Sequence, residues 1–530
     1  PASSTRRLNG FHFNQTHLAA SLREDGLEKA GFIGLDAIRQ TLEGGDLPEP
    51  VEPFSGEELY TAKITAMALR SPVVGLGYIS YVTPWRQYDY FPGLDELELR
   101  KQTPVLGGFR SEDYVAHREW AHAPDGTMVP LSVIHRADAD LQTPHPVIQY
   151  GYGSYEASSN PGFSVSRLSL LDRGVVYVVA HVRGGGELGR DWYLQGKKLQ
   201  KTNTFTDFVA VTDHVAAQPW ADESRIAAYG GSAGGLLMGA IVNMAPEKYC
   251  GVLAAVPFVD PVTSISDPDL PLSALEWEEW GNPIEDKEVY EYMTSYAPYE
   301  NVRPVAYPPI AAVTSLNDTR VLYVEPAKWV PKLREFTTGT APILLRIEMD
   351  GGHGGGSGRY RQWEDTAWEY AFLLNCLGID SYPPPGGIRW AGLLGAPWLS
   401  PDKVAWHYPD AEPISPVRRR FNPLLTWVFA TASGNRHVSP RAPGPLASRG
   451  GSCGTENVGI RPKTATSPAE MHIIANSTAV ALRRGLASTR TKTEGRPIDQ
   501  LGHRAPLGFA DSAFSAFDAE LFEDQLTHAG

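Results

Sequence analysis

The sequence is poor in cysteine and in long apolar runs, and each shortage excludes a class of protein. Its 530 residues include three cysteines, Cys250, Cys376 and Cys453, too few for the disulfide framework of a secreted scaffold. We therefore expect a reducing, cytoplasmic setting. No apolar run approaches the roughly 20 residues that span a bilayer. The N-terminal PASSTRRLNG lacks the apolar core of a signal peptide, and its first residue, Pro rather than Met, is expected of a fragment or a processed product.

Basic charge is also scarce. The formal net charge of -14 argues against a general nucleic-acid binder, which needs a basic surface, and is compatible with cationic substrates. The glycine run 184–186 after His181 matches neither G-x-G-x-x-G nor a Walker lysine motif, so we reject a nucleotide site. No cluster of His, Cys and carboxylates has metal-ligand spacing. We expect no cofactor and no metal.

Three regions of the sequence differ in composition and in the pattern of apolar residues. Residues 1–110 are mixed, with a helix-like stretch around Leu27 to Leu42 and an apolar stretch from Val73 to Val82. Residues 111–382 alternate apolar, strand-like runs with amphipathic helices. Residues 383–530 are rich in Pro, Gly, Ser, Thr, Ala and Arg, which predicts a low-complexity, disordered tail.

The middle region predicts an α/β fold with a mostly parallel, doubly wound sheet covered on both faces. Helices are expected over 204–217, with Thr204 or Thr206 as the cap, and over 236–243, 325–336 and 363–376. Continuous apolar runs indicate the buried strands: PVIQYG (146–151), VVYVVAHV (175–182), RIAAYG (225–230), VLAAVPF (252–258), PIAAVTSL (309–316) and PILLRIEM (342–349).

The strongest local motif is Gly230-Gly231-Ser232-Ala233-Gly234, which fits G-x-S-x-G between a predicted strand and a predicted helix. In this context the glycines allow a sharp turn that projects the serine hydroxyl from the sheet, and the helix aims its first amides at a forming oxyanion. The alternative is a glycine-rich turn with an incidental serine. The flanking strand and helix favour a nucleophile.

A nucleophilic serine needs a base and an orienting acid. Asp318 follows the strand 309–316, and His353 lies in DGGHGG after the strand 342–349. Taken singly, Asp318 could be a turn or cap residue and His353 a solvated loop residue. Their order after Ser232, each at a strand end, is that of the α/β-hydrolase triad, so we expect Ser232, Asp318 and His353 to be catalytic.

These motifs together resemble the prolyl oligopeptidase family of serine peptidases, and within it the oligopeptidase B group. The resemblance extends over about residues 70–380. It is carried by YGYGSY (150–155), SRLSLLDRG (166–174), HVRGGGELG (181–189), GGSAGG (230–235), VPFVDPVT (256–263), EEWGNP (278–283), LNDTRVLYVEPAKW (316–329) and DGGHGG (350–355).

The resemblance implies further roles. Tyr152 and the Ala233 amide would form the oxyanion hole, and Arg320 would hold the substrate backbone. Without the resemblance, Tyr152 would be read as a turn aromatic and Arg320 as a surface residue. Glu276 and Glu278 would bind a basic side chain before the scissile bond, because residues two apart share a face if this stretch is extended. Their alternative is a solvated acidic turn.

One departure concerns the second subsite. Where the oligopeptidase B group tends to carry two acidic residues, this sequence has Asn160-Pro161-Gly162, which leaves a preference for a single basic residue.

Family members also carry a seven-bladed β-propeller ahead of the hydrolase domain, at roughly 40–50 residues per blade. The region 1–110 can supply only a partial propeller and linker, and Val73 to Tyr90 with LELRKQTPV (97–105) resembles a last blade. We expect an absent or incomplete size filter and exposed strand edges that favour association.

We therefore expect a serine endopeptidase that cleaves peptides after Arg or Lys. A carboxylesterase on the same fold is one alternative, and the acidic pair argues against it. A catalytically inert fragment is another, favoured by the missing propeller and opposed by the triad.

Overall fold

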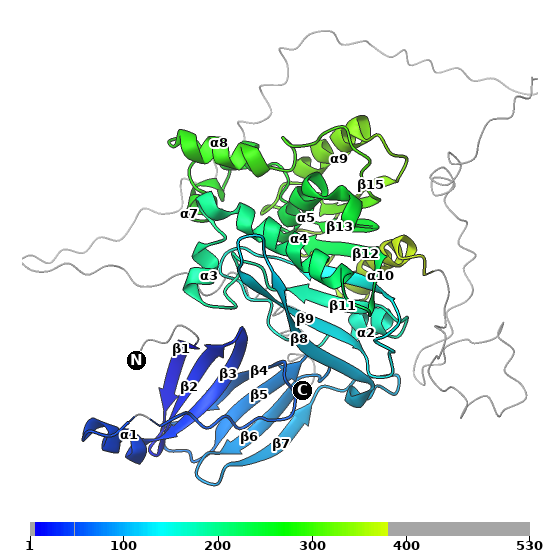
Figure 1. Cartoon of the computed structure of the whole chain (residues 1–530). Coiled ribbons are helices and arrows are strands. Elements are labelled where there is room, and N and C mark those ends of the chain that lie inside the picture. The colour runs from blue at the N-terminus through cyan, green and yellow to red at the C-terminus, as the bar shows by residue number, and fades with distance from the viewer. Residues whose placement is uncertain (1–5, 47, 380–530) are drawn as a thin grey trace, which may run out of the picture. The chain divides into compact units, whose positions relative to one another are not determined.

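The computed structural model describes residues 6–46 and 48–379 (Figure 1). Cys453 and the predicted tail over 383–530 lie outside the described residues.

The central element is an eight-stranded sheet with the order β15-β14-β13-β12-β10-β11-β9-β8. The six strands from β10 to β15 pair in parallel, and β8 and β9 join antiparallel at one edge. This confirms the predicted, mostly parallel α/β sheet. The strands are β8 (Tyr114–His122), β9 (Met128–Arg136), β10 (His145–Gly151), β11 (Val176–Ala180), β12 (Ala221–Gly231), β13 (Gly251–Ala255), β14 (Ile310–Ser315) and β15 (Ile343–Glu348).

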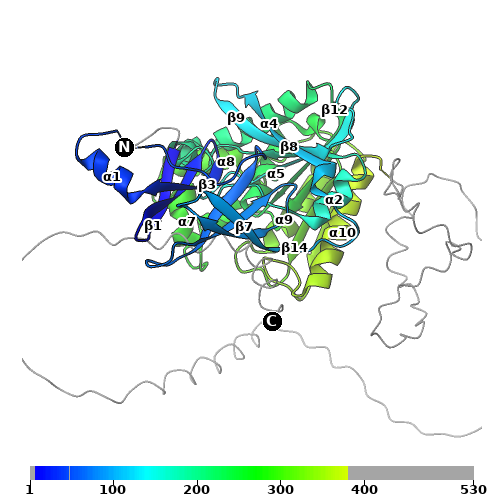
Figure 2. The ribbon, with the colours of Figure 1, turned by 90° about the horizontal axis from the view of Figure 1, so that it is seen from below.

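Helices cover both faces of this sheet, because alternate strand residues point to opposite sides. Val147 and Val178 belong to a core with residues of α4, α5 and α9, whereas Ile148 and Val179 belong to a second core with residues of α2 and α10. Figure 2 shows α2 and α10 side by side. The helices of this region are α2 (Val165–Leu171), α3 (Arg190–Leu194), α4 (Thr202–Ala216), α5 (Ala233–Met244), α6 (Pro261–Ile265), α7 (Ser273–Trp280), α8 (Lys287–Tyr296), α9 (Val324–Phe336) and α10 (Arg359–Cys376), with short 3-10 turns at Ser111–Asp113, Lys198–Gln200 and Pro246–Lys248.

The predicted cap of α4 is wrong. The helix begins at Thr202, and neither Thr204 nor Thr206 caps it. The Thr204 hydroxyl donates instead to the carbonyl oxygen of Arg183, at 2.7 Å. Tertiary contact with the loop after β11 therefore takes up the side chain.

Two antiparallel sheets precede the eight-stranded sheet in the sequence, with a three-stranded order β1-β2-β3 and a four-stranded order β4-β5-β6-β7. The second contains the blade-like unit expected from the sequence, with β4 added. The elements are β1 (Arg6–Phe13), β2 (His17–Glu24), β3 (Leu27–Gly34), α1 (Leu35–Leu42), β4 (Tyr60–Met67), β5 (Val74–Ser80), β6 (Arg86–Phe91) and β7 (Glu96–Gln102).

The expected helix around Leu27 to Leu42 is half wrong, since its first eight residues form β3. β3 pairs along its whole length with β2, through a two-residue turn at Asp25 and Gly26 with φ of 50° and 83°. Asp-Gly with positive φ at both positions is typical of a hairpin turn. This turn signal outweighs the helical periodicity.

Candidate active site

Ser232 lies in the sharp turn between β12 and α5, with φ 58° and ψ -118°. This conformation is strained for a residue with a side chain, and the surrounding backbone enforces it. A Cβ on Gly230 would lie 2.5 Å from the carbonyl oxygen of Gly234, and one on Gly234 would lie 2.7 Å from that of Gly151. The glycines of the motif are therefore needed for close packing against β10 as well as for the turn.

Asp318 and His353 follow β14 and β15 and meet at the same end of the sheet. His353 Nδ1 is 2.7 Å from Asp318 Oδ2, and Asp318 Oδ1 accepts hydrogen bonds from the amides of Arg320 and Val321 at 2.9 and 3.0 Å. Asp318 is buried. With Nδ1–H donating to the carboxylate, His353 Nε2 is left to accept a proton. Among the described residues, no hydrogen bond joins His353 to Ser232.

Tyr152 follows β10 and lies next to the Ser232 turn. Its Cα would be 3.4 Å from a Cβ on Gly234. Burial raises the pKa of Tyr152, and a side-chain hydrogen bond with Ser232 opposes that rise. Ala233, buried, is the first residue of α5, where backbone amides have no acceptor within the helix. The hydroxyl of Tyr152 and this amide therefore lie around Ser232 as two potential donors.

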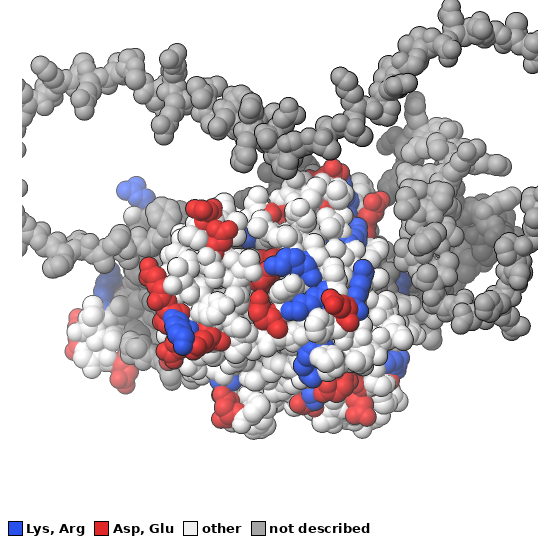
Figure 3. Space-filling model, turned by 90° about the horizontal axis from the view of Figure 1, so that it is seen from above, with Lys and Arg blue, Asp and Glu red and all other residues white. Residues whose placement is uncertain are grey.

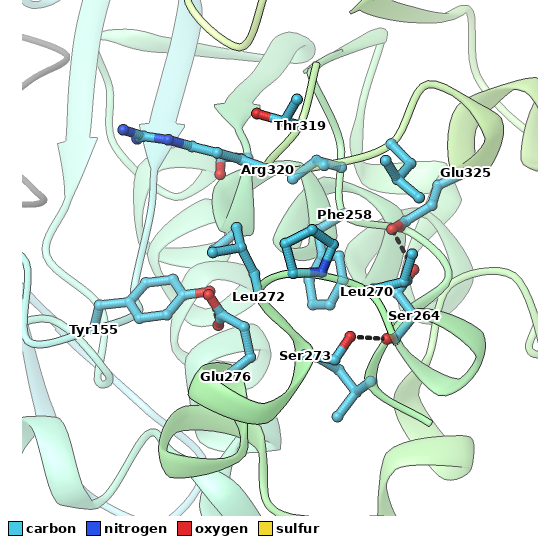
Figure 4. A pocket seen from close by; sticks show the side chains of 16 residues that line it. Tyr155, Phe258, Ser264, Leu270, Leu272, Ser273, Glu276, Thr319, Arg320 and Glu325 are labelled. Atoms are coloured by element: carbon cyan, nitrogen blue, oxygen red, sulfur yellow. Dashed lines mark hydrogen bonds between the residues drawn. The ribbon is translucent and has the colours of Figure 1, made fainter. Parts of the chain in front are cut away.

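A pocket opens beside Ser232 (Figure 4). Glu276 and Tyr155 lie together on one side of it, Arg320 and Thr319 come from the segment after Asp318, and leucines and Phe258 lie between. Its lining comprises Tyr155, Ser232, Ala233, Phe258, Ser264, Ile265, Leu270, Pro271, Leu272, Ser273, Glu276, Thr319, Arg320, Val321, Leu322 and Glu325.

Glu276 is held by hydrogen bonds within this pocket. Its Oε2 accepts from the Tyr155 hydroxyl at 2.6 Å and from Trp280 Nε1 at 2.9 Å. Burial raises the pKa of Glu276, and these hydrogen bonds oppose the rise. The second oxygen, Oε1, has no hydrogen-bond donor among the described residues. The site thus offers an acidic group on a largely apolar wall.

The predicted partner of Glu276 is wrong. The stretch is the helix α7 and is not extended, so Glu276 and Glu278 do not share a face. The side chain of Glu278 is 90% exposed and lies 3.5 Å from Lys198. Glu279, three residues after Glu276, is the buried carboxylate beside it. Helical spacing could have identified Glu279 had the stretch been read as a helix.

Sequence reasoning also missed Glu325. It is buried in the first turn of α9 and lines the pocket. Its Oε1 accepts from the Ser264 hydroxyl at 2.7 Å and its Oε2 from the Asp260 amide at 2.9 Å. Burial raises the pKa of Glu325 to about 7. The available signal was its position within LNDTRVLYVEPAKW (316–329), shortly after Asp318, which follows β14.

The departure at Asn160 has a structural counterpart. Asn160 Oδ1 accepts from Arg23 at 2.8 Å, its amide nitrogen donates to Glu28 at 3.3 Å, and the carbonyl oxygen of Pro161 accepts from Thr61 at 2.9 Å. This segment is therefore bound to the N-terminal sheets.

Surface charge is mixed on the face in Figure 3, where basic and acidic side chains of the described residues are interspersed. Within residues 6–46 and 48–379, no group of His, Cys, Asp and Glu is arranged to hold a metal ion. The helices of the described part include none that is long and apolar enough to cross a membrane.

Comparisons with known proteins agree with this geometry. The model of the prolyl oligopeptidase family matches residues 161–380. The chain is 49% identical to dipeptidyl aminopeptidase BI of Pseudoxanthomonas mexicana over 305 residues, which is 57% of this chain and 42% of the relative. It is 42% identical to protease 2 of Moraxella lacunata over 326 residues, 61% of this chain and 47% of the relative.

Among solved structures, oligopeptidase B from Leishmania major matches with a TM-score of 0.65 and 39% identity, covering 71% of this chain and 52% of that protein. This match extends beyond the region that the family model covers. The chain spans about half the length of the relatives it matches. Residues 161–380 thus match the prolyl oligopeptidase family, and the chain is similar in sequence and in structure to oligopeptidase B.

Proposed function

We propose that this chain is a serine-type oligopeptidase that hydrolyses peptide bonds after Arg or Lys. The observation that carries the proposal is the opening of one pocket onto both Ser232 and the half-buried carboxylate of Glu276. A substrate whose carbonyl carbon lies at Ser232 would place the preceding side chain in that pocket.

The chemistry follows from the surroundings of each group. Ser232 Oγ attacks the carbonyl carbon while His353 Nε2 takes its proton, and Asp318 stabilises the resulting imidazolium. Tyr152 and the Ala233 amide donate hydrogen bonds to the oxyanion. His353 then gives its proton to the leaving amine as the peptide bond breaks. In the second half of the reaction, His353 takes a proton from water while the water attacks the acyl-enzyme, and it returns that proton to Ser232 Oγ as the acid product leaves. Arg320, on the pocket wall, would hold the substrate backbone.

The proton transfer requires His353 to reach Ser232. His353 lies in the sequence Gly351-Gly352-His353-Gly354-Gly355, whose glycines allow the loop to adjust. Catalytic hydrogen bonds are often long before substrate binds and shorten in the complex. We therefore propose that the hydrogen bond between His353 and Ser232 forms when substrate is bound.

A basic substrate side chain is favoured by charge. Glu276 Oε2 is already bonded to Tyr155 and Trp280, which fixes the carboxylate and leaves Oε1 for a guanidinium or ammonium group. A bound cation would also restore the ionised state that burial disfavours. Leucines and Phe258 on the walls can pack against the apolar part of an Arg or Lys side chain.

The test compares chromogenic arginyl, prolyl and short acyl-ester substrates on the wild type and on Ser232→Ala. We expect turnover of the arginyl substrate that is lost in the variant. Turnover of esters alone would replace the proposal by a carboxylesterase. Absence of all turnover, together with no labelling by a fluorophosphonate, would identify an inert chain.

A further inference from the structure

The turn after β10 carries two tyrosines of the site in an unusual backbone conformation. Gly153, Tyr155 and Glu156 have φ of 74°, 61° and 58°. Positive φ is a strained conformation for residues with side chains. Such a turn persists only where its surroundings hold it, and it must be held accurately because Tyr152 reaches Ser232 and Tyr155 reaches Glu276.

Lys201 holds the first part of this turn, at Gly153 and Ser154. Its ammonium donates to the carbonyl oxygen of Gly153 and to the Ser154 hydroxyl, both at 2.6 Å. The ammonium also lies 5.0 Å from the ring centre of Trp280, within the range of a cation–π contact. Lys201 is 1% exposed.

The burial of Lys201 is not explained by an ion pair, since no carboxylate lies within salt-bridge distance of it among the described residues. Burial lowers the pKa of Lys201 to about 8, and the more distant charge of Glu279 opposes this effect. A buried ammonium with only neutral partners is costly to stability. Its presence beside a strained turn points to a role in the site.

The helix α7 holds the other side of the same turn. Glu279 Oε1 accepts from the amide of Tyr155 at 3.0 Å, and its Oε2 accepts from the Tyr193 hydroxyl at 2.6 Å. One helical turn earlier, Glu276 accepts from the hydroxyl of Tyr155. Trp280 links the two sides, since its Nε1 donates to Glu276 while its ring faces Lys201.

We propose that Lys201 is a positioning residue for catalysis: it holds the 153–154 turn so that Tyr152 reaches the oxyanion at Ser232 while Tyr155 reaches Glu276. This inference rests on the proposed roles of Ser232 and Tyr152. Three buried residues, Lys201, Glu279 and Trp280, then hold both the oxyanion contact and the specificity pocket in place.

The primary test measures the rate of labelling by a fluorophosphonate, whose phosphoryl oxygen needs the oxyanion hole but no basic side chain. In Lys201→Met we expect labelling and kcat to fall roughly 10- to 100-fold, with a smaller change in KM. Loss of a whole oxyanion donor costs about 10²–10³-fold, and a displaced donor should cost less. The thermal midpoint should stay equal or rise, because a buried unpaired charge is removed.

Lys332→Met is the matched control. Lys332 also donates to a backbone carbonyl, that of Tyr299, at 2.7 Å, and lies 4.2 Å from the centre of the same tyrosine ring. It is absent from the pocket lining. Its labelling rate should match that of the wild type.

A pH profile gives a second measure. Glu279 on α7 is the charged group that acts on the pKa of Lys201, and Tyr292 on α8 bonds through its hydroxyl to the neighbouring Thr202. We expect the wild-type labelling rate to fall as pH rises through about 8, as Lys201 loses its proton, and this limb to be absent in Lys201→Met.

Two results would overturn the inference. One is a Lys201→Met variant that labels as fast as the wild type. The other is a loss of labelling that accompanies a lowered thermal midpoint, which indicates a purely structural role. If the wild type itself fails to label, the proposed function fails. Amide hydrogen exchange over residues 152–156 then decides the inference: faster exchange in Lys201→Met alone supports it, and unchanged exchange refutes it.

Discussion

Glu276 and Glu278 are two residues apart in the sequence and have very different surroundings. Glu276 is hydrogen-bonded to Tyr155 and Trp280 in the pocket that Ser232 also lines, whereas the side chain of Glu278 is 90% exposed. A carboxylate in a partly desolvated pocket binds a cation more strongly than one in water, where exposed pairs contribute little. One glutamate therefore carries the proposed specificity.

This contrast gives a prediction for Glu276→Gln. The kcat/KM for arginyl substrates should fall about 10- to 100-fold, because a hydrogen bond to a charged group contributes about 1.5–3 kcal/mol. Neutral substrates should change little. Glu278→Gln is the control and should remain near the wild-type value in the same steady-state assay. Equal losses in the two variants would contradict the assignment.

At the scale of single residues, the sequence identified the groups proposed to react and not the groups that hold them. Ser232, Asp318 and His353 could be read from a motif and two strand ends. Lys201 could not, because its relevance depends on contacts with residues far away in the chain, and Glu279 and Glu325 had only weak local signals. The bond between Tyr155 and Glu276, for example, spans 121 positions.

Among the elements, the turn between β12 and α5 depends on close backbone packing. Gly230 has no room for a Cβ, which would lie 2.5 Å from a backbone oxygen, whereas a Cβ on Gly231 would meet its nearest atom at 3.5 Å. The two neighbouring glycines thus provide a matched pair.

We predict that Gly230→Ala lowers the free energy of unfolding by about 1–3 kcal/mol, the usual cost of overpacking. Gly231→Ala should be close to neutral. Urea denaturation of both variants measures the difference. Similar stabilities would show that the turn relaxes around the added methyl group.

The contact between β8 and α4 predicts that the stability of the fold depends on pH. Glu119 on β8 bonds to His117 at 3.1 Å and to His214 on α4 at 2.8 Å. Burial raises the pKa of Glu119, but these hydrogen bonds outweigh it and lower the pKa to about 2.

Because the folded-state pKa lies below the unfolded value of about 4.3, ionised Glu119 stabilises the fold above pH 4.3. This stability is lost as the pH falls toward 2. In Glu119→Gln, the unfolding free energy should therefore fall less steeply with acidification in this window. Denaturant titrations at several pH values test this, with the exposed Glu223→Gln as the control. An unchanged slope would argue against the Glu119 contribution.

The sequence predicted helices and strands correctly where a strand is buried on both faces of the sheet. The parallel strands were predicted because both faces are apolar. The errors lie at β3, α7 and the start of α4, where short segments carry few periods. In each case a turn or a tertiary contact decided the conformation.

At the scale of the whole molecule, the described residues ahead of β8 form a three-stranded and a four-stranded sheet. Two such sheets have fewer strands than a closed seven-bladed propeller. If the proposed function holds, we predict that the purified 530-residue chain cleaves intact casein as well as short peptides. Gel electrophoresis of the digest measures this. Peptide cleavage with intact casein left uncut would show that access is still restricted.

The edge strand β1 gives a second prediction at this scale. It pairs with β2 alone among the described strands and exposes Leu8, Phe11 and Phe13 at 57%, 59% and 56%. Exposed apolar edges favour strand pairing between molecules, and a lysine on such an edge opposes it.

Phe11→Lys should therefore reduce concentration-dependent association in sedimentation velocity. Leu42→Lys is the control, since Leu42 is 83% exposed at the end of α1 and lies on no strand. Equal association of the wild type and both variants would exclude β1 as the contact.

The sequence by itself determined the α/β class, the resemblance to the prolyl oligopeptidase family and the order of the three proposed triad residues, because these depend on local periodicity and on motifs at strand ends. In a parallel sheet, strands that end near Ser232, Asp318 and His353 bring them to one edge. Only the tertiary structure decided which carboxylates face the pocket and which lysine holds the turn that carries Tyr152. Those assignments depend on the rotation of α7 and on long-range hydrogen bonds, for which the linear spacing of residues gives no physical measure.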